Sequence, residues 1–139
     1  MICLEYRIDN NKIILRLEPG EEVIDSLREL RDKLDIENGF FFGIGAVDKL
    51  KLGNYDVEDK NYREKEFTGS YEVSNFKGNM GPDKIHAHIT VGDENFDTLA
   101  GHCSEARVSG TFEIILRRSD EFKLTHKFDT ETGLDVWDL

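Results

Sequence analysis

Hydrophobic and polar residues alternate along several short stretches of this 139-residue chain, and a period of two indicates β-strands. The first two stretches, residues 6–8 and 13–17, flank Asp9-Asn10-Asn11 and predict a β-hairpin. Turn-rich segments at residues 56–61 and 78–82 separate later stretches. Besides a hairpin that carries histidines, the other strands are predicted at residues 39–47, 49–55, 62–67, 71–76, 107–116 and 122–128.

One stretch has a helical period instead. From Glu22 to about Ile36, apolar residues recur three and four positions apart and charged residues mostly lie between them. Such an amphipathic helix is expected to cover one face of a sheet. We therefore predict a single α+β domain over residues 1–139, in which one main helix covers a mostly antiparallel β-sheet.

Composition narrows the classes of protein that fit. The net charge is −11 and the pI is near 4.8, which disfavours direct contact with nucleic acid because phosphates need basic partners. No stretch has the apolar length of a membrane span, and the N-terminus has no signal-peptide core, so a cytoplasmic protein is expected. Cys3 and Cys103 lie far apart without a Cys-x-x-Cys motif, which favours reduced thiols.

The residues that most clearly indicate chemistry are three histidines. His86 and His88 lie two positions apart in a strand-like run, so both rings are expected on one face of the strand. After a turn-rich stretch, His102 can return on an antiparallel partner. A turn centred near Glu94 would place His102 opposite His86, and all three rings would then share one side of a hairpin.

Three imidazole ligands suit zinc and leave a fourth position open for water, a small-molecule ligand or a substrate atom. Copper, nickel and iron also accept such ligands, so the sequence favours zinc without excluding them. The alternative interpretation is a pair of half-exposed strand histidines that bind no metal.

Other polar residues have a structural and a functional interpretation. Glu72 interrupts a strand-like run and is either a hydrogen-bond partner of a metal-binding histidine or a general base near it, or a surface residue. Asp93, Glu94 and Asp97 fit turn chemistry better than hydrogen bonding to the metal ligands or acting as a general base near a metal-bound water. His126 is interpreted as an ordinary strand histidine, with a fourth ligand or proton shuttle as the alternative.

Taken in order, the motifs of the chain resemble the PPC family, named for plants and prokaryotes conserved. The resemblance spans nearly the whole chain. The segments that carry it are Arg16-Leu17-Glu18-Pro19-Gly20-Glu21-Glu22, Gly43-Ile44-Gly45-Ala46-Val47, Gly69-Ser70-Tyr71-Glu72-Val73, Asn79, His86-Ala87-His88, Gly92-Asp93, Gly101-His102 and the stretch from Phe128 to Leu134.

The resemblance implies a compact α+β domain that assembles as a homotrimer, with a metal held at positions that His86, His88 and His102 match. Plant relatives place this domain after an AT-hook and act on DNA or chromatin, but this chain has no such hook and has Ser70 where the plant segment has arginine. The resemblance attaches no enzymatic reaction to prokaryotic members. Cupins also combine such histidines, but the helix after Gly20 does not fit them.

Three functions follow as expectations. The first is a zinc-binding homotrimer with a regulatory or ligand-binding role, in which a small molecule or water occupies the metal. The second is a zinc-dependent enzyme, a hydrolase or lyase that uses metal-activated water. The third is a DNA-associated transcription regulator, against which the charge argues.

Overall fold

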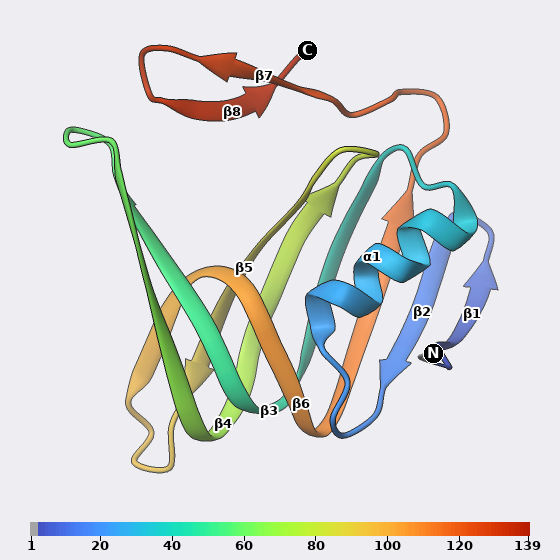
Figure 1. The fold of residues 1–139 in the computed structure, drawn as a ribbon. Coiled ribbons are helices and arrows are strands. Elements are labelled where there is room, and N and C mark those ends of the chain that lie inside the picture. The colour runs from blue at the N-terminus through green and yellow to red at the C-terminus, as the bar shows by residue number, and fades with distance from the viewer. Residues whose placement is uncertain (1–2) are drawn as a thin grey trace.

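The computed structural model describes residues 3–139 and consists of one helix and eight strands within them (Figure 1). Six strands form one sheet in the order β1-β2-β6-β3-β4-β5, and the last two form a separate hairpin. Every pairing between strands is antiparallel. The elements are β1 (Glu5–Asp9), β2 (Lys12–Leu17), α1 (Val23–Leu34), β3 (Gly39–Asp56), β4 (Asn61–Met80), β5 (Ile85–Gly92), β6 (Thr98–Arg118), β7 (His126–Asp129) and β8 (Leu134–Trp137).

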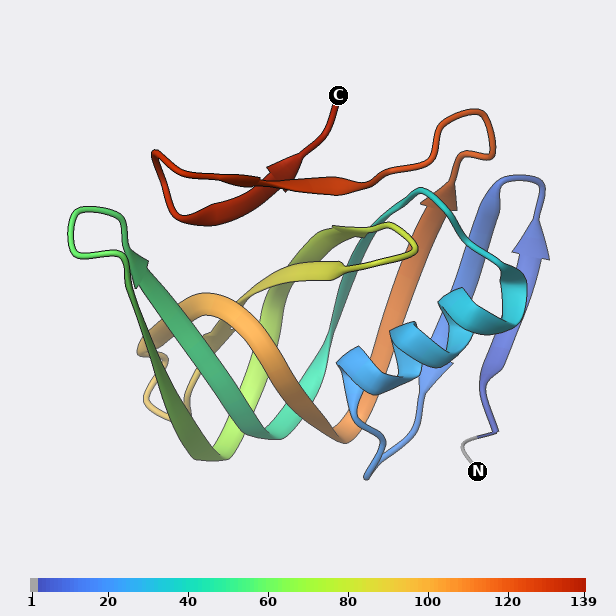
Figure 2. The same ribbon diagram turned by 45° about the horizontal axis from the view of Figure 1, so that its top comes forward.

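The predicted first hairpin and helix are both present. The helix starts after Glu22, whose carboxylate accepts a hydrogen bond from the Asp25 amide at 2.6 Å and so caps the first turn. It ends where Asp35 takes a left-handed conformation, slightly earlier than the predicted end. One side of α1 lies against the sheet and contacts β6 and β5, as Figures 1 and 2 show.

Two long strands replace four predicted ones. Residues 39–47 and 49–55 belong to one strand, β3, and residues 62–67 and 71–76 belong to β4. Irregularities in the pairing lie between Gly43 and Gly45 and between Val47 and Lys49, so β3 bends without ending. A side chain at Gly45 would come within 2.3 Å of the Thr111 carbonyl oxygen, which shows that close approach of β3 to β6 requires glycine there.

Strand β6 closes part of the sheet on itself. Its second half pairs with β2 and β3, whereas its first half pairs with β3 on one edge and with β5 on the other. Because β4 also joins β3 to β5, the four strands β3, β4, β5 and β6 form a closed ring. The curved course of β6 is visible in Figure 1.

The core lies between the sheet and α1 and is entirely apolar except for Ser26 among the described residues. At its centre the ring of Phe76 stacks on Phe41 and meets Phe112 edge-on, each with centroids 5.3 Å apart. The structure thus confirms an α+β arrangement of one helix and a mostly antiparallel sheet. Within residues 3–139, no helix is long and apolar enough to cross a membrane.

The β7–β8 hairpin lies apart from the main sheet and reaches the tip of the β3–β4 hairpin (Figures 1 and 2). The Tyr55 hydroxyl donates to the Thr132 carbonyl at 2.7 Å, and Lys60 Nζ donates to the Thr130 carbonyl at 2.9 Å. The strand predicted over residues 122–128 was mostly wrong, because regular pairing starts only at His126. The segment before it runs without a strand partner.

Candidate metal centre

His86 and His88 lie on β5 with both side chains on the face away from the core. The residues between and after them, Ala87 and Ile89, are buried in the core, as the alternation of a strand requires. This arrangement confirms the predicted position of the two rings. The rings meet with centroids 5.0 Å apart and with the two Nε2 atoms 3.2 Å apart.

His102 comes from the first half of β6, which pairs with β5. The structure places it opposite His88, so the predicted register with His86 was wrong by two residues. The connecting turn explains the difference. Its five residues lie between the paired Gly92 and Thr98, and the Asp93 carboxylate accepts from two later amides at 2.9 Å, which centres the turn one residue further on.

The three rings form one cluster even so. The ring of His102 has its centroid 5.4 Å from that of His86 and 5.8 Å from that of His88. One nitrogen from each ring lies within 4.8 Å of the others. Ligands about 2.0–2.1 Å from a tetrahedral zinc are roughly 3.3 Å apart. The His86–His88 nitrogen separation already has that value, and small ring rotations would bring His102 into the same geometry.

The electrostatic surroundings keep His86 and His102 neutral. Burial lowers the pKa of His86 to about 4, and the charges of His88 and His102 act in the same direction. Burial is also the main cause that lowers the pKa of His102. At neutral pH the imidazoles of His86 and His102 therefore carry a free lone pair, which is the form that binds a metal.

A buried atom beside the cluster fits the same interpretation. Asn79 lies directly opposite His86 on β4, and its Oδ1 atom is buried without a hydrogen-bond partner among the described residues. A histidine that binds metal through Nε2 carries its proton on Nδ1 and donates it to a nearby oxygen. The donor set and this free acceptor fit a metal held by the three rings.

A hydrogen-bonded group of polar side chains borders His102 on its other side. Gly53 pairs with both His102 and Glu64, so the three lie in one row across the sheet. The phenol of Tyr62 occupies the space above Gly53, where a side chain would meet its oxygen at 1.9 Å. Its ring meets the His102 ring edge-on at 6.0 Å. The Tyr62 ring therefore restricts the position of His102.

Glu64 fixes this group by accepting two hydrogen bonds. Its Oε2 atom accepts from the Tyr62 hydroxyl and from the Ser104 hydroxyl, both at 2.9 Å. Those hydroxyls are the main causes that lower the pKa of Glu64, so the carboxylate is ionised at neutral pH. The pairing of β3 with β6 shifts between Lys51 and Leu52, which leaves Ser104 as an extra residue.

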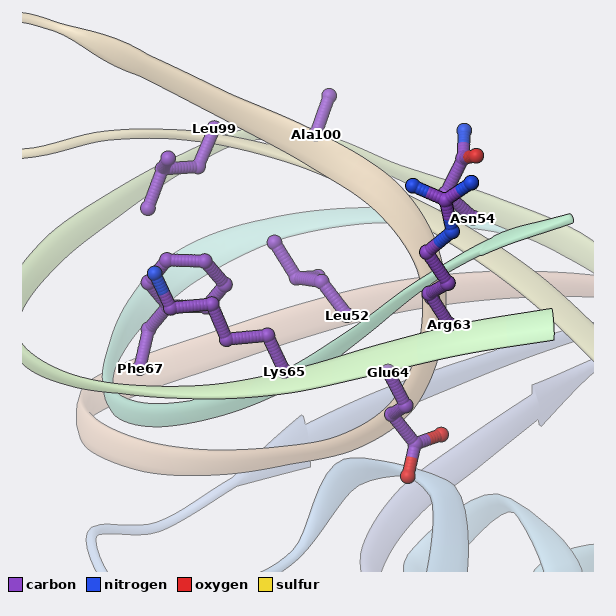
Figure 3. A pocket seen from close by; sticks show the side chains of 9 residues that line it. Leu52, Asn54, Arg63, Glu64, Lys65, Phe67, Leu99 and Ala100 are labelled. Carbon is purple, nitrogen blue, oxygen red and sulfur yellow. The ribbon is translucent and has the colours of Figure 1, made fainter.

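A small pocket of about 220 Å³ lies near the same strands but does not include the histidines. Leu52, Phe67 and Leu99 point into it, whereas the carboxylate of Glu64 points away (Figure 3). The pocket and the polar group around Glu64 therefore lie on different sides of the sheet.

The structure places the other candidate residues outside the cluster. Glu72 is exposed and pairs with Gly92, about 13 Å along β5 from His88, which agrees with its interpretation as a surface residue and not with a role beside the histidines. Asp93 serves the turn, as its structural interpretation predicted. His126 begins β7 and pairs through Nδ1 with the Asp83 carboxylate at 3.2 Å, and it lies near enough to His86 to be one of the minor causes that lower the pKa of that ring.

Cys103 fits the expected inert thiol. Its side chain is buried on the face opposite to His102, and burial raises its pKa to about 12. A Cys-His nucleophilic pair from these neighbours is therefore excluded by geometry.

Tyr62, Glu64 and Ser104 were not predicted from the sequence. Their place beside His102 depends on the pairing of β3 with β6, which are far apart in sequence, so no local pattern could have indicated it.

Comparison with known proteins agrees with the geometry. The family model described as the Plants and Prokaryotes Conserved (PCC) domain, also abbreviated PPC, matches residues 5–120. Bifunctional protein GlmU from two Synechococcus strains is 29% and 28% identical to this chain, over 126 and 122 residues. The match covers 86% of this chain but only 18% and 19% of those proteins.

Three solved structures share the fold over nearly their whole length. A protein from Bacteroides thetaiotaomicron, provisionally named as DNA-binding, is 28% identical with a TM-score of 0.91 and coverage of 97% of this chain and 96% of that one. A metal-containing protein from Archaeoglobus fulgidus is 27% identical with a TM-score of 0.84 and 99% coverage of both chains. A plant- and prokaryote-conserved (PPC) protein from Pyrococcus horikoshii is 28% identical with a TM-score of 0.83, covering 100% and 98%.

The family model covers the sheet, the helix and all three histidines, and the structural relatives share the whole fold. The chain belongs to the Plants and Prokaryotes Conserved domain family.

Proposed function

We propose that this chain is a metal-binding PPC domain that holds one zinc ion through His86, His88 and His102. The observation that carries the proposal is the cluster itself, in which one nitrogen of each ring lies within 4.8 Å of the others. The three imidazoles come from β5 and β6, which pair with each other within the closed set of four strands. The fold therefore holds the side chains in place before metal binds. The Archaeoglobus fulgidus relative, named as metal-containing, supports the same assignment.

The chemistry of such a site follows from its ligands. Three neutral imidazoles fill three positions of a tetrahedral zinc and leave the fourth for water or a small ligand. A bound zinc supplies a Lewis acid at that position. The protein contributes rings whose orientation is limited by Tyr62 beside His102 and an acceptor, Asn79 Oδ1, opposite His86.

Titration of metal-free, untagged protein with zinc tests this proposal. We expect one zinc ion to bind per chain, with a release of few protons at pH 7 because His86 and His102 are already neutral. Competition with copper, nickel and iron in the same assay identifies the preferred metal. A protein that stays folded but binds none of these ions would contradict the proposal.

We also propose that the chain forms a homotrimer through an exposed apolar patch on the outer face of β2, β6 and β3. Ile14, Ile115 and Phe42 lie in one row across these strands, and all three are exposed. Phe40 and Ile44 extend the row along β3 and are also exposed. An apolar surface of this kind on a sheet favours association with a second copy. The resemblance to the PPC family implies that three copies assemble.

Phe42→Glu is expected to dissociate the assembly to monomers, because it places a charge in the centre of the patch. Light scattering after size-exclusion chromatography gives the mass of both forms. Phe96→Glu is the matched control, since Phe96 is 92% exposed in the turn before β6 and lies outside the patch. A monomeric wild-type protein, or a trimer that survives Phe42→Glu, would refute this interface.

An enzymatic function has one feature in its favour, the open fourth position. Glu72, the carboxylate that could have assisted it, lies away from the histidines. Glu64, in the same row as His102, is already bonded to two hydroxyls. We therefore favour a ligand-binding function over a catalytic one.

Direct DNA binding is a weaker proposal for this chain, despite the name of the Bacteroides thetaiotaomicron relative. The net charge of −11 repels phosphates, and binding through counterion release requires a basic surface.

A further inference from the structure

A lysine directly precedes β5, the strand that carries two of the histidines. Lys84 precedes β5, and alternation places its side chain on the same face as His86 and His88, about 6.6 Å along the strand from His86. Its carbonyl accepts a hydrogen bond from the Gly81 amide at 2.9 Å, which closes the loop between β4 and β5. The backbone that carries Lys84 is thereby fixed relative to the cluster.

The ammonium group of Lys84 has no carboxylate partner within 4.0 Å among the described residues. Lys49 and Lys51 on the same sheet, by contrast, each pair with a glutamate. The adjacent Asp83 accepts from His126 instead. Lys84 is also half-buried, so water does not screen it fully.

Glu64 lies on the other side of the cluster, in one row with His102 across Gly53. Its carboxylate keeps its negative charge while it accepts hydrogen bonds from the Tyr62 and Ser104 hydroxyls, so it offsets part of the positive charge that a metal would bring. Lys84 lies two residues before His86 and on the same face, so its ammonium adds positive charge at the opposite end of the cluster.

Three neutral imidazoles add no negative charge to a divalent metal, and the single charge of Glu64 beside His102 would offset its double charge only in part. Together with the Lys84 ammonium they would create a strongly positive point on a protein whose overall charge is negative. We propose that the fourth position of the metal binds a small oxyanion, a carboxylate or a phosphate, with one oxygen on the metal and a second on Lys84 Nζ. This inference rests on the proposed metal site and names the class of ligand that the site takes.

The oxyanion is preferred over neutral ligands for a physical reason. A second oxygen that carries part of the negative charge can accept a charge-assisted hydrogen bond from the ammonium, which is about twice as strong as a neutral one. An uncharged amide of the same size offers the metal an oxygen but gives Lys84 no charged partner. The site therefore selects a ligand both by its negative charge and by its two oxygen atoms.

Calorimetric titration of the zinc-loaded protein with acetate, inorganic phosphate and acetamide tests the inference. We expect acetate or phosphate to bind and acetamide to bind at least about tenfold more weakly. Lys84→Met is expected to weaken oxyanion binding about tenfold or more without changing zinc content, whereas Lys84→Arg keeps the charge and most of the affinity. The comparison of acetate with phosphate identifies the preferred oxyanion.

Lys33→Met is the matched control, because Lys33 is exposed on α1, which covers the opposite face of the sheet from the histidines, and also has no carboxylate partner within 4.0 Å among the described residues. Its oxyanion affinity is expected to stay within about twofold of wild type. Equal affinity of wild type and Lys84→Met, or equal losses in Lys84→Met and Lys33→Met, would overturn the inference. A failure of the protein to load zinc is a separate result, measured beforehand, and would count against the metal site itself.

Discussion

His88→Ala is expected to abolish metal retention at the histidine cluster. Only two imidazoles would remain, and one of the closest contacts of the cluster, the 3.2 Å separation of the His86 and His88 Nε2 atoms, would be gone. The loss of affinity should exceed the roughly 10–100-fold that removal of an outer-shell partner costs. Zinc content per chain, measured by elemental mass spectrometry on untagged protein, reports the result.

The substitution isolates metal binding from folding, because His88 is exposed and points away from the core. The fold of His88→Ala, followed by circular dichroism, should therefore match that of the wild type. His126→Ala is the control, since it removes a histidine that pairs with Asp83 outside the cluster. Retained zinc in His88→Ala, or an equal loss in His126→Ala, would show that the ligands are assigned wrongly.

Phe76→Ala is expected to lower the free energy of unfolding by about 3–5 kcal/mol. The ring of Phe76 is fully buried and contacts Phe41 and Phe112, each at 5.3 Å between centroids, so its removal leaves a cavity that strands cannot easily close. Urea denaturation followed by tryptophan fluorescence or circular dichroism gives the difference.

The matched control is Phe96→Ala, which removes the same ring from a 92% exposed position and should change the free energy of unfolding by less than about 0.5 kcal/mol. Phe76 pairs with Ile89, the residue after His88, so loosening of the core is expected to reach the metal strand. A cost below about 1 kcal/mol for Phe76→Ala would mean that these three rings do not form the packed centre of the fold.

Sequence analysis predicted the elements whose signal is local. The helix could be placed because its apolar spacing and the capping Glu22 lie within a few residues of each other. The shared face of His86 and His88 followed from the alternation of a strand, which no distant contact alters. The mostly antiparallel sheet with a single helix was predicted from the number and spacing of these elements.

Predictions from the sequence were wrong for features that depend on pairing between strands far apart in the chain. The continuity of β3 across residues 40–55 depends on β6, whose two edges hold β3 and β5 together. The register of His102 was missed by two residues because the hydrogen bonds of the Asp93 carboxylate, and not the most turn-prone residues, set the centre of the turn. Alternation gave Glu72 the correct side of a strand but no distance to the histidines.

The central claim, that His86, His88 and His102 hold a metal ion, is tested most directly by anomalous X-ray scattering from crystals of untagged, zinc-loaded protein at the zinc absorption edge. We predict one anomalous peak per chain, about 2.0–2.1 Å from one nitrogen of each ring. No peak at the cluster, or a peak coordinated by other residues, would contradict it.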